Sequence, residues 1–199
     1  MIPRRFTNND SHLTPHALRL TPHGFTLIEI IVILAVISIL VAILTPTVLK
    51  YLVEARSDRA QSDAANISAM INDLIKDTGQ FPGAHLGTGK TFLCSGTGTI
   101  AGGSFGGTTT NCENLENHLV TNSPGGSPYP STGKFSWKGP YITNLSEDPW
   151  GNAYEINAST LVGGNTSVTW VISAGPNGTF DTSPTATTIS GDDIGVRIK

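Results

Sequence analysis

Hydrophobic residues are distributed unevenly along this chain of 199 residues. Residues 25–44 form an apolar run that contains a single charged residue, Glu29. At about 1.5 Å of rise per residue, a helix of this length spans roughly 30 Å, the thickness of the hydrocarbon core of a bilayer. The run therefore predicts a membrane-spanning helix. Three arginines and one aspartate precede it, so we expect the N-terminus on the cytoplasmic side and the remaining chain across the membrane.

After Pro46 the pattern becomes amphipathic. Apolar side chains recur at spacings of three, four or multiples of these, in Val48, Leu52, Ala60, Ala64, Ile67, Ile71, Leu74 and Ile75. This predicts that the helix continues with one face packed on another element. Gly79 suits a left-handed cap, so we expect the helix to end near Thr78. Pro46 lacks a backbone donor, and we expect a break there, either as a loosened turn or as the end of the membrane helix.

The chain beyond the helix divides by composition. Residues 80–137 are rich in Gly, Ser, Thr, Asn and Pro without sustained periodicity, which predicts a variable loop region with a short helix near 113–120. Strand candidates follow around 141–142, 153–156 and 167–173. A small antiparallel sheet that covers the amphipathic helix gives an α+β fold.

Charge and candidate chemical groups limit the classes of function that the chain could have. The formal net charge of -3 gives no support for a nucleic-acid partner. No Ser-His-Asp set, phosphate-binding glycine loop or pair of carboxylates stands out, which argues against an enzyme. Cys94 and Cys112 lie in the glycine-rich region. Their even number favours a disulfide formed in an oxidising compartment, with two free thiols as the alternative.

The start of the apolar run carries a specific motif. A polar leader ends in Gly24, and Phe25-Thr26-Leu27-Ile28-Glu29 follows at once. A secretory signal has the reverse order, because its apolar stretch precedes the cleavage site. The G-F-T-L-x-E string resembles the type IV prepilin signature. The resemblance implies that an aspartyl prepilin peptidase cleaves after Gly24 and that the new N-terminal Phe25 is N-methylated.

Glu29 supports this resemblance on physical grounds. An acidic residue inside a membrane helix costs roughly 2.5 to 3.5 kcal/mol on insertion scales, so it needs a partner. In prepilin-like proteins the matching glutamate pairs with the N-terminal amine of a neighbouring subunit. The resemblance thus implies that Glu29 sets the axial register of a homopolymer and that the helix loosens at Pro46 during assembly. A neutral Glu29 that faces lipid is the alternative.

Motifs in the last third resemble the major pseudopilins of type II secretion. They are G-P-Y-I at 139–142, D-P-W-G-N-A-Y at 148–154, S-A-G-P-N-G at 173–178 and G-D-D-I-G at 191–195. The resemblance implies a calcium loop, with Ca²⁺ ligands from Asn177, Asp181, Asp192 and Asp193 and from main-chain carbonyls near Ser173 and Ser190. Asn177 stands where an aspartate is common. Turn-forming, solvated acidic residues are the alternative.

The expected organisation has five parts: a cleaved leader (1–24), a membrane and assembly helix (25–45), an amphipathic stem (46–79), a variable loop region (80–137) and a C-terminal sheet with the calcium loop (138–199). The resemblance implies a structural subunit of a pseudopilus, held in the bacterial inner membrane with its C-terminal domain in the periplasm. The partners it implies are other copies of the chain, prepilin peptidase, minor pseudopilins, the inner-membrane assembly platform and membrane lipid. The alternatives are a type IV pilin for adhesion, motility or DNA uptake, and a tethered calcium- or ligand-binding module that does not polymerise.

Overall fold

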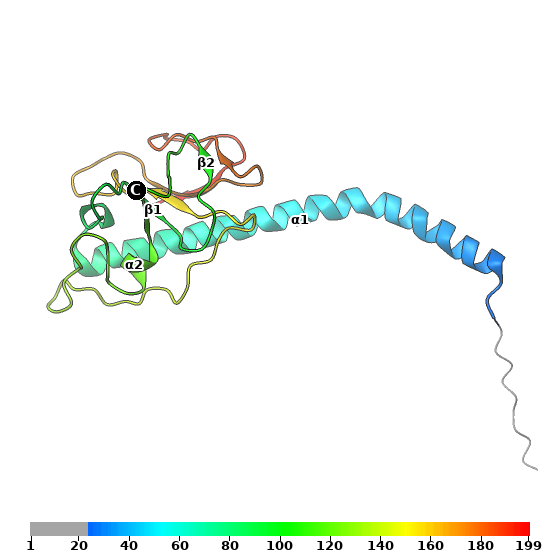
Figure 1. The fold of residues 1–199 in the computed structure, drawn as a ribbon, viewed down its shortest axis with the longest axis horizontal. Coiled ribbons are helices and arrows are strands. Elements are labelled where there is room, and N and C mark those ends of the chain that lie inside the picture. The colour runs from blue at the N-terminus through cyan, green and yellow to red at the C-terminus, as the bar shows by residue number, and fades with distance from the viewer. Residues whose placement is uncertain (1–23) are drawn as a thin grey trace, which may run out of the picture. The chain divides into compact units, whose positions relative to one another are not determined.

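The structure is a computed structural model that describes residues 24–199. The chain divides into two compact units, Met1–Thr45 and Pro46–Lys199. Helix α1 (Leu27–Thr78) runs through the boundary between them (Figure 1). Apart from Gly24, the predicted leader lies outside the described residues.

Helix α1 ends where the sequence predicts. Its last residue is Thr78, and Gly79 follows with a left-handed φ of 67° while its N–H donates to the carbonyl of Ile75 at 2.8 Å. Pro46 lies inside the helix, so the alternative that the helix ends there is wrong. A proline removes one helical hydrogen bond, and the flanking turns keep theirs. Loosening of this turn during assembly stays a prediction.

The main sheet lies in the second unit and has the strand order β3-β1-β4-β5-β7. Its strands are β1 (Phe92–Cys94), β3 (Cys112–Asn114), β4 (Glu155–Asn157), β5 (Trp170–Ser173) and β7 (Ile194–Arg197). Three neighbouring pairs are antiparallel, and β1 with β3 is parallel. The predicted α+β arrangement is confirmed, but the sheet is mixed rather than antiparallel. The reason is that β3 reaches β1 through a crossover and not through a hairpin.

The two faces of this sheet carry different cores, because successive strand residues point to opposite faces. Leu93, Ile156 and Val171 pack against the buried side of α1, formed by Ala64, Ile67, Ile71 and Leu74. Cys94 and Ile172 belong to a second cluster, whose other buried members are Phe92, Ala101, Phe105, Cys112, Ala153, Ala174 and Phe180. The sheet is therefore packed between α1 and a layer of loops.

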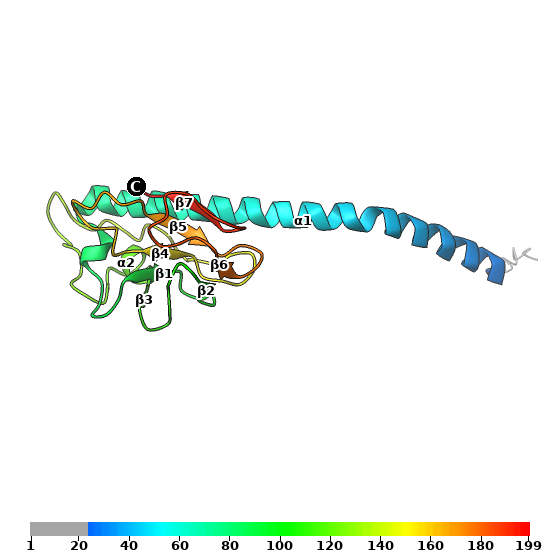
Figure 2. The same cartoon turned by 90° about the horizontal axis from the view of Figure 1, so that it is seen from above.

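Strand β7 lies beside α1, and β3 is the strand farthest from it (Figure 2). Two hydrogen bonds of 3.5 Å join the helix to this strand, from the Gln61 amide to the carbonyl of Gly195 and from the Ser68 hydroxyl to the carbonyl of Arg197. Strand β7 was not predicted from the sequence, because the G-D-D-I-G motif resembles a calcium loop.

The prediction of a variable loop region over 80–137 is wrong for several segments. This region contributes β1, β3, the 3-10 turn η1 (Pro82–Ala84), helix α2 (Glu116–Leu119) and β2 (Gly102–Gly103), which pairs with β6 (Thr179–Phe180). Leu93, Leu115 and Leu119 are fully buried. Strands of two or three residues are too short to show an alternating pattern, so their periodicity could not be detected.

The strand expected around 141–142 is also wrong. Tyr141 lies in a loop, where its N–H donates to the carbonyl of Leu119 at 2.8 Å and its hydroxyl donates to Asp77 at 3.2 Å. These bonds hold the loop against the C-terminal end of α1 and against the core that lies between α1 and the sheet. The other two predicted strands are found as β4, which begins two residues later and ends one residue later than predicted, and as β5, which begins three residues later than predicted.

Candidate functional site

The predicted cleavage junction precedes the first turn of α1. Gly24 and Phe25 are exposed and lie outside the helix. The N–H and hydroxyl of Thr26 donate to the Glu29 carboxylate at 2.9 and 3.1 Å, and the N–H of Glu29 donates to the Thr26 hydroxyl at 3.3 Å. This reciprocal arrangement is a capping box, which starts the helix and places negative charge at its N-terminus. Within one subunit Glu29 therefore has a local partner, and pairing with another subunit would exchange that partner.

The apolar residues of the first unit are open to their surroundings. Its large hydrophobic side chains between Phe25 and Leu44 are 44% to 77% exposed. Helix α1 is long and apolar enough to cross a membrane. The exposed apolar surface continues beyond Pro46 through Val48, Leu49, Tyr51, Leu52 and Val53. A surface of this extent requires lipid or other helices to cover it.

The four predicted calcium ligands lie in one hydrogen-bonded segment. The N–H of Asn177 donates to Asp192 at 2.9 Å, and its side-chain amide donates to Asp181 at 3.3 Å. Asp193 is buried, and its Oδ2 accepts the N–H groups of Asp181 and Thr182 at 3.0 and 2.8 Å. Its Oδ1 has no hydrogen-bond partner, and burial raises the pKa of this carboxyl.

The segment supplies too few side-chain ligands for a metal by itself. Among residues 24–199, no three His, Cys, Asp or Glu side chains are grouped so that they could hold a metal ion. Calcium accepts amide and main-chain carbonyl oxygens as well as carboxylates. The unpartnered oxygen of Asp193, together with the side chains of Asn177, Asp181 and Asp192, fits calcium only if backbone carbonyls complete the ligand set.

The D-P-W-G motif holds the start of this segment in place, a role that the sequence analysis does not predict. Asp148 is buried, and its Oδ1 accepts the N–H groups of Trp150 and Asn152 at 2.9 and 2.8 Å. Its Oδ2 accepts the hydroxyl of Ser173 at 2.6 Å, and the same hydroxyl oxygen accepts the N–H of Gly175 at 3.1 Å. An aspartate before proline at a turn is the signal that could have indicated this role.

Cys94 and Cys112 are joined by a disulfide, with a Cα–Cα distance of 5.9 Å. The bridge ties β1 to β3, which are already paired in the sheet. It therefore closes the crossover between these strands, which carries Ala101 and Phe105 of the second core.

Glu113, beside this bridge, contacts two loop segments and helix α2. Its carboxylate accepts the N–H groups of Gly87 at 2.7 Å and Gly125 at 2.6 Å, and it contacts Nε2 of His118 at 3.1 Å. The other ring nitrogen of His118 lies 2.7 Å from the hydroxyl of Tyr129. Burial lowers the pKa of His118, while the charge of Glu113 opposes this shift. The network makes the loop region a fixed part of the domain.

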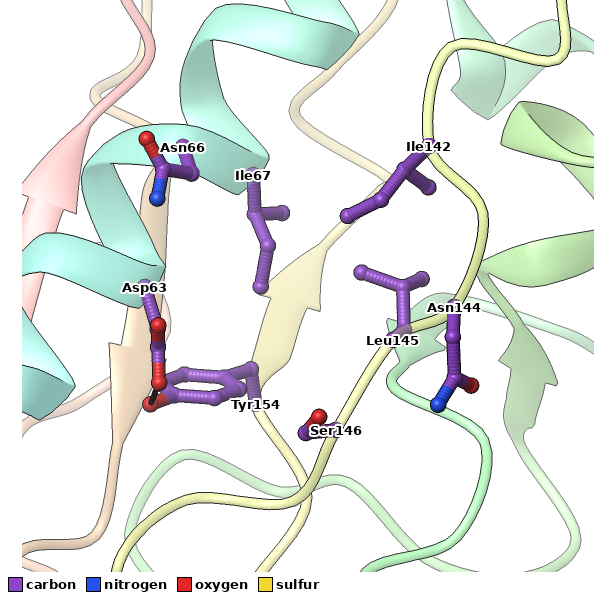
Figure 3. A pocket seen from close by; sticks show the side chains of 8 residues that line it. All are labelled: Asp63, Asn66, Ile67, Ile142, Asn144, Leu145, Ser146 and Tyr154. Atoms are coloured by element: carbon purple, nitrogen blue, oxygen red, sulfur yellow. Dashed lines mark hydrogen bonds between the residues drawn. The ribbon is translucent and has the colours of Figure 1, made fainter.

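A small hollow lies between α1 and the loop of residues 142–146 (Figure 3). Its volume is about 90 Å³, which is far below the several hundred Å³ of ordinary cofactor sites. Its lining residues are Asp63, Asn66, Ile67, Ile142, Asn144, Leu145, Ser146 and Tyr154. The hydroxyl of Tyr154 donates to Asp63 at 3.3 Å. The hollow has room for one side chain, with apolar walls and a carboxylate.

Comparisons with known proteins agree with the sequence motifs. Residues 21–45 match the prokaryotic N-terminal methylation motif, and residues 116–192 match the family of type II secretion system protein G. No solved structure matches the chain.

Curated relatives give the same result. The type II secretion system core protein G of Pseudomonas aeruginosa is 28% identical over 66% of this chain and 70% of its own length. The core protein G of Dickeya chrysanthemi is 24% identical over 86% of this chain and 84% of its own length. The core protein G of Aeromonas hydrophila is 23% identical over 67% of this chain and 71% of its own length. The chain therefore carries the N-terminal methylation motif at its start and a domain of the type II secretion system protein G family in its second half, and it is similar to the core protein G of three bacteria.

Proposed function

We propose that this chain is the major structural subunit of a pseudopilus that drives protein export by type II secretion. The observation that carries the proposal is the position of Glu29, a carboxylate in an exposed apolar helix directly after the Gly24-Phe25 junction. Cleavage by prepilin peptidase creates an amine at Phe25, which is then N-methylated. That amine neutralises Glu29 of a neighbouring copy, so the buried charges are compensated only in the polymer.

The proposed location follows from charge and length. Loss of three arginines and one aspartate with the leader takes the formal net charge from -3 to -5 in the mature chain. The chain crosses the bacterial inner membrane once, with the unit Pro46–Lys199 in the periplasm. Its partners are other copies, minor pseudopilins, the assembly platform of the inner membrane and membrane lipid. Its role is structural and does not include catalysis.

Deletion of the gene tests this function. We expect proteins to be lost from the culture supernatant while surface motility stays normal. The wild-type gene should restore secretion, and Glu29→Ala should not. Glu54→Ala is the matched control, because Glu54 lies on the same helix and makes an exposed ion pair of 3.8 Å with Lys50, which contributes little.

Other outcomes would contradict the proposal. Normal secretion with lost motility would identify a type IV pilin instead. No change in either property would favour a tethered module. Filament assembly by Glu29→Ala would contradict both filament functions.

We also propose that Asn177, Asp181, Asp192 and Asp193, with nearby main-chain carbonyls, bind Ca²⁺. The support is the unpartnered buried oxygen of Asp193 and the clustering of the other side chains around Asn177. When bound, the ion would offset the negative charge of the aspartates. Asp193 would hold the backbone of Asp181 and Thr182 beside it, so the segment would keep one conformation.

Calcium binding can be measured by thermal unfolding of the full chain in detergent. We expect Ca²⁺ to raise the melting temperature of the wild type and of Glu147→Gln, an exposed acidic control outside the segment. Asp193→Asn should lose most of this increase. An equal increase in Asp193→Asn, or none in the wild type, would contradict the proposed site.

A further inference from the structure

We propose that the hollow in Figure 3 receives the side chain of Arg56 from a second copy of this chain, which makes it a subunit contact of the filament. This inference rests on the proposed function, because it requires polymerisation. A helical filament needs two different, complementary patches on each subunit. The hollow and the Arg56 side chain are such a pair.

The receiving side is built around Asp63. The carboxylate is 33% exposed, and its Oδ2 contacts both the Tyr154 hydroxyl at 3.3 Å and Nε of Arg59 at 3.5 Å. Both contacts use the same oxygen, which leaves Oδ1 for another donor. A guanidinium N–H of an incoming arginine can donate to this oxygen. Figure 3 shows Ile67 and Leu145 pointing into the hollow, where they form an apolar wall beside this carboxylate.

The donating side is a cation without a partner in its own subunit. Arg56 is exposed, and it makes no ion pair among residues 24–199. The other cations in this part of α1 are paired within the helix, Lys50 with Glu54 and Arg59 with Asp63. An arginine packs its aliphatic stem on apolar surface while its head binds a charge. A volume of about 90 Å³ suits the end of one such side chain.

The predicted filament register brings the two sides together. All copies enter the membrane in the same direction, so their helices lie parallel. When the amine of Phe25 in one copy meets Glu29 of the next, the copies are displaced by four residues, about 6 Å along the axis. The same displacement brings Arg56 level with Ala60 of the neighbour. The remaining axial distance to Asp63 is about 4.5 Å, which an extended arginine side chain spans.

Cross-linking tests the contact directly. Two versions of the full chain, Arg56→Cys and Asp63→Cys, are expressed together and oxidised in assembled filaments. We expect a mixed dimer. The native cysteines are already paired with each other, so they do not compete. Lys134→Cys, on an exposed loop, replaces Arg56→Cys in the control and should give no mixed dimer with Asp63→Cys.

Charge exchange gives an independent readout. We expect Arg56→Glu to lower filament yield by about tenfold or more, because it places two like charges together. Arg56→Glu combined with Asp63→Arg should restore most of the yield, and Lys134→Glu should leave it unchanged. A change at Asp63 also removes the bonds to Tyr154 and Arg59, whereas Arg56→Glu leaves these bonds intact. The result for Arg56→Glu alone therefore decides the test.

The outcomes separate this inference from the proposed function. Filaments that form with Arg56→Glu at the wild-type yield and give no mixed dimer would overturn the contact and leave the pseudopilin function standing. Dimers between Arg56→Cys copies alone would also overturn it, because they would place the two Arg56 positions against each other. Failure of the wild-type chain to polymerise would overturn both.

Discussion

The carboxylate of Glu155 packs directly against the backbone of Gly107, in the space that a Cβ at residue 107 would occupy. Glu155 lies on β4, opposite Cys94 of β1 and Ile172 of β5, and it is fully buried. Its carboxylate oxygens make no well-formed hydrogen bond. Burial raises its pKa to about 8, and the nearby N–H of Gly107 offsets only part of this effect. The second core thus encloses an acid that is neutral below this pKa.

Because Glu155 is buried, we expect the free energy of unfolding to fall as pH rises. The folded-state pKa of about 8 lies above the ordinary value of 4.5, so the protonated acid is stabilised by folding and that contribution is lost towards pH 8. Relative to Glu155→Gln, we expect the wild type to lose at most about 1.4 kcal/mol of unfolding free energy per pH unit between these values. Denaturant unfolding of both chains at several pH values measures the difference. A difference that does not depend on pH would contradict the prediction.

Gly107→Ala should destabilise the fold. The new Cβ would collide with the Glu155 carboxylate, which is enclosed and cannot move away freely. We expect a loss of about 1 to 3 kcal/mol, the usual range for overpacking a core. Gly102→Ala is the control, since nothing lies within 4 Å of a Cβ at that position. Thermal unfolding of both variants measures the effect, and equal melting temperatures would argue against it.

Removal of the disulfide should weaken the domain without changing its fold. Cys94 and Cys112 are separated by 18 positions, and the bridge restricts the unfolded chain between them. We expect Cys94→Ser with Cys112→Ser to lower the free energy of unfolding by about 2 to 4 kcal/mol. A reductant should lower the melting temperature of the wild type by a similar amount and leave the double variant unaffected. Sensitivity of the double variant to reductant would show that the bridge is not the cause.

Glu113→Ala should loosen the loops that surround β3. The change leaves the N–H groups of Gly87 and Gly125 and the ring of His118 without their acceptor. The His118 ring is fully buried and the two N–H groups are partly buried, so we expect a loss of about 1 to 3 kcal/mol. Hydrogen exchange of the two glycine amides measures the effect, and both should exchange faster than in the wild type. Glu116→Ala, which removes the hydrogen bond from the Asn114 side-chain amide, should leave these amides protected.

Helix α1 could be predicted from the sequence more completely than the sheet. The apolar run and the amphipathic stem repeat over many residues, and Gly79 marks the end of α1 without ambiguity. Strands β1 and β3 have three residues each, and their burial depends on partners from distant parts of the chain. Glycine-rich sequence around them predicted loops, although Leu93 and Leu115 lie in the main core.

By itself the sequence determined the membrane-length helix, and it predicted the processing junction and the similarity to type II secretion pseudopilins. Each of these depends on local order along the chain, such as Glu29 five positions after Gly24, and helix geometry converts that order directly into structure. Tertiary structure alone decided the parallel pairing of β1 with β3, the burial of Glu155 against Gly107 and the hollow beside Asp63. These features join residues that are far apart in the chain, and such contacts are fixed by packing of the whole domain rather than by neighbouring residues.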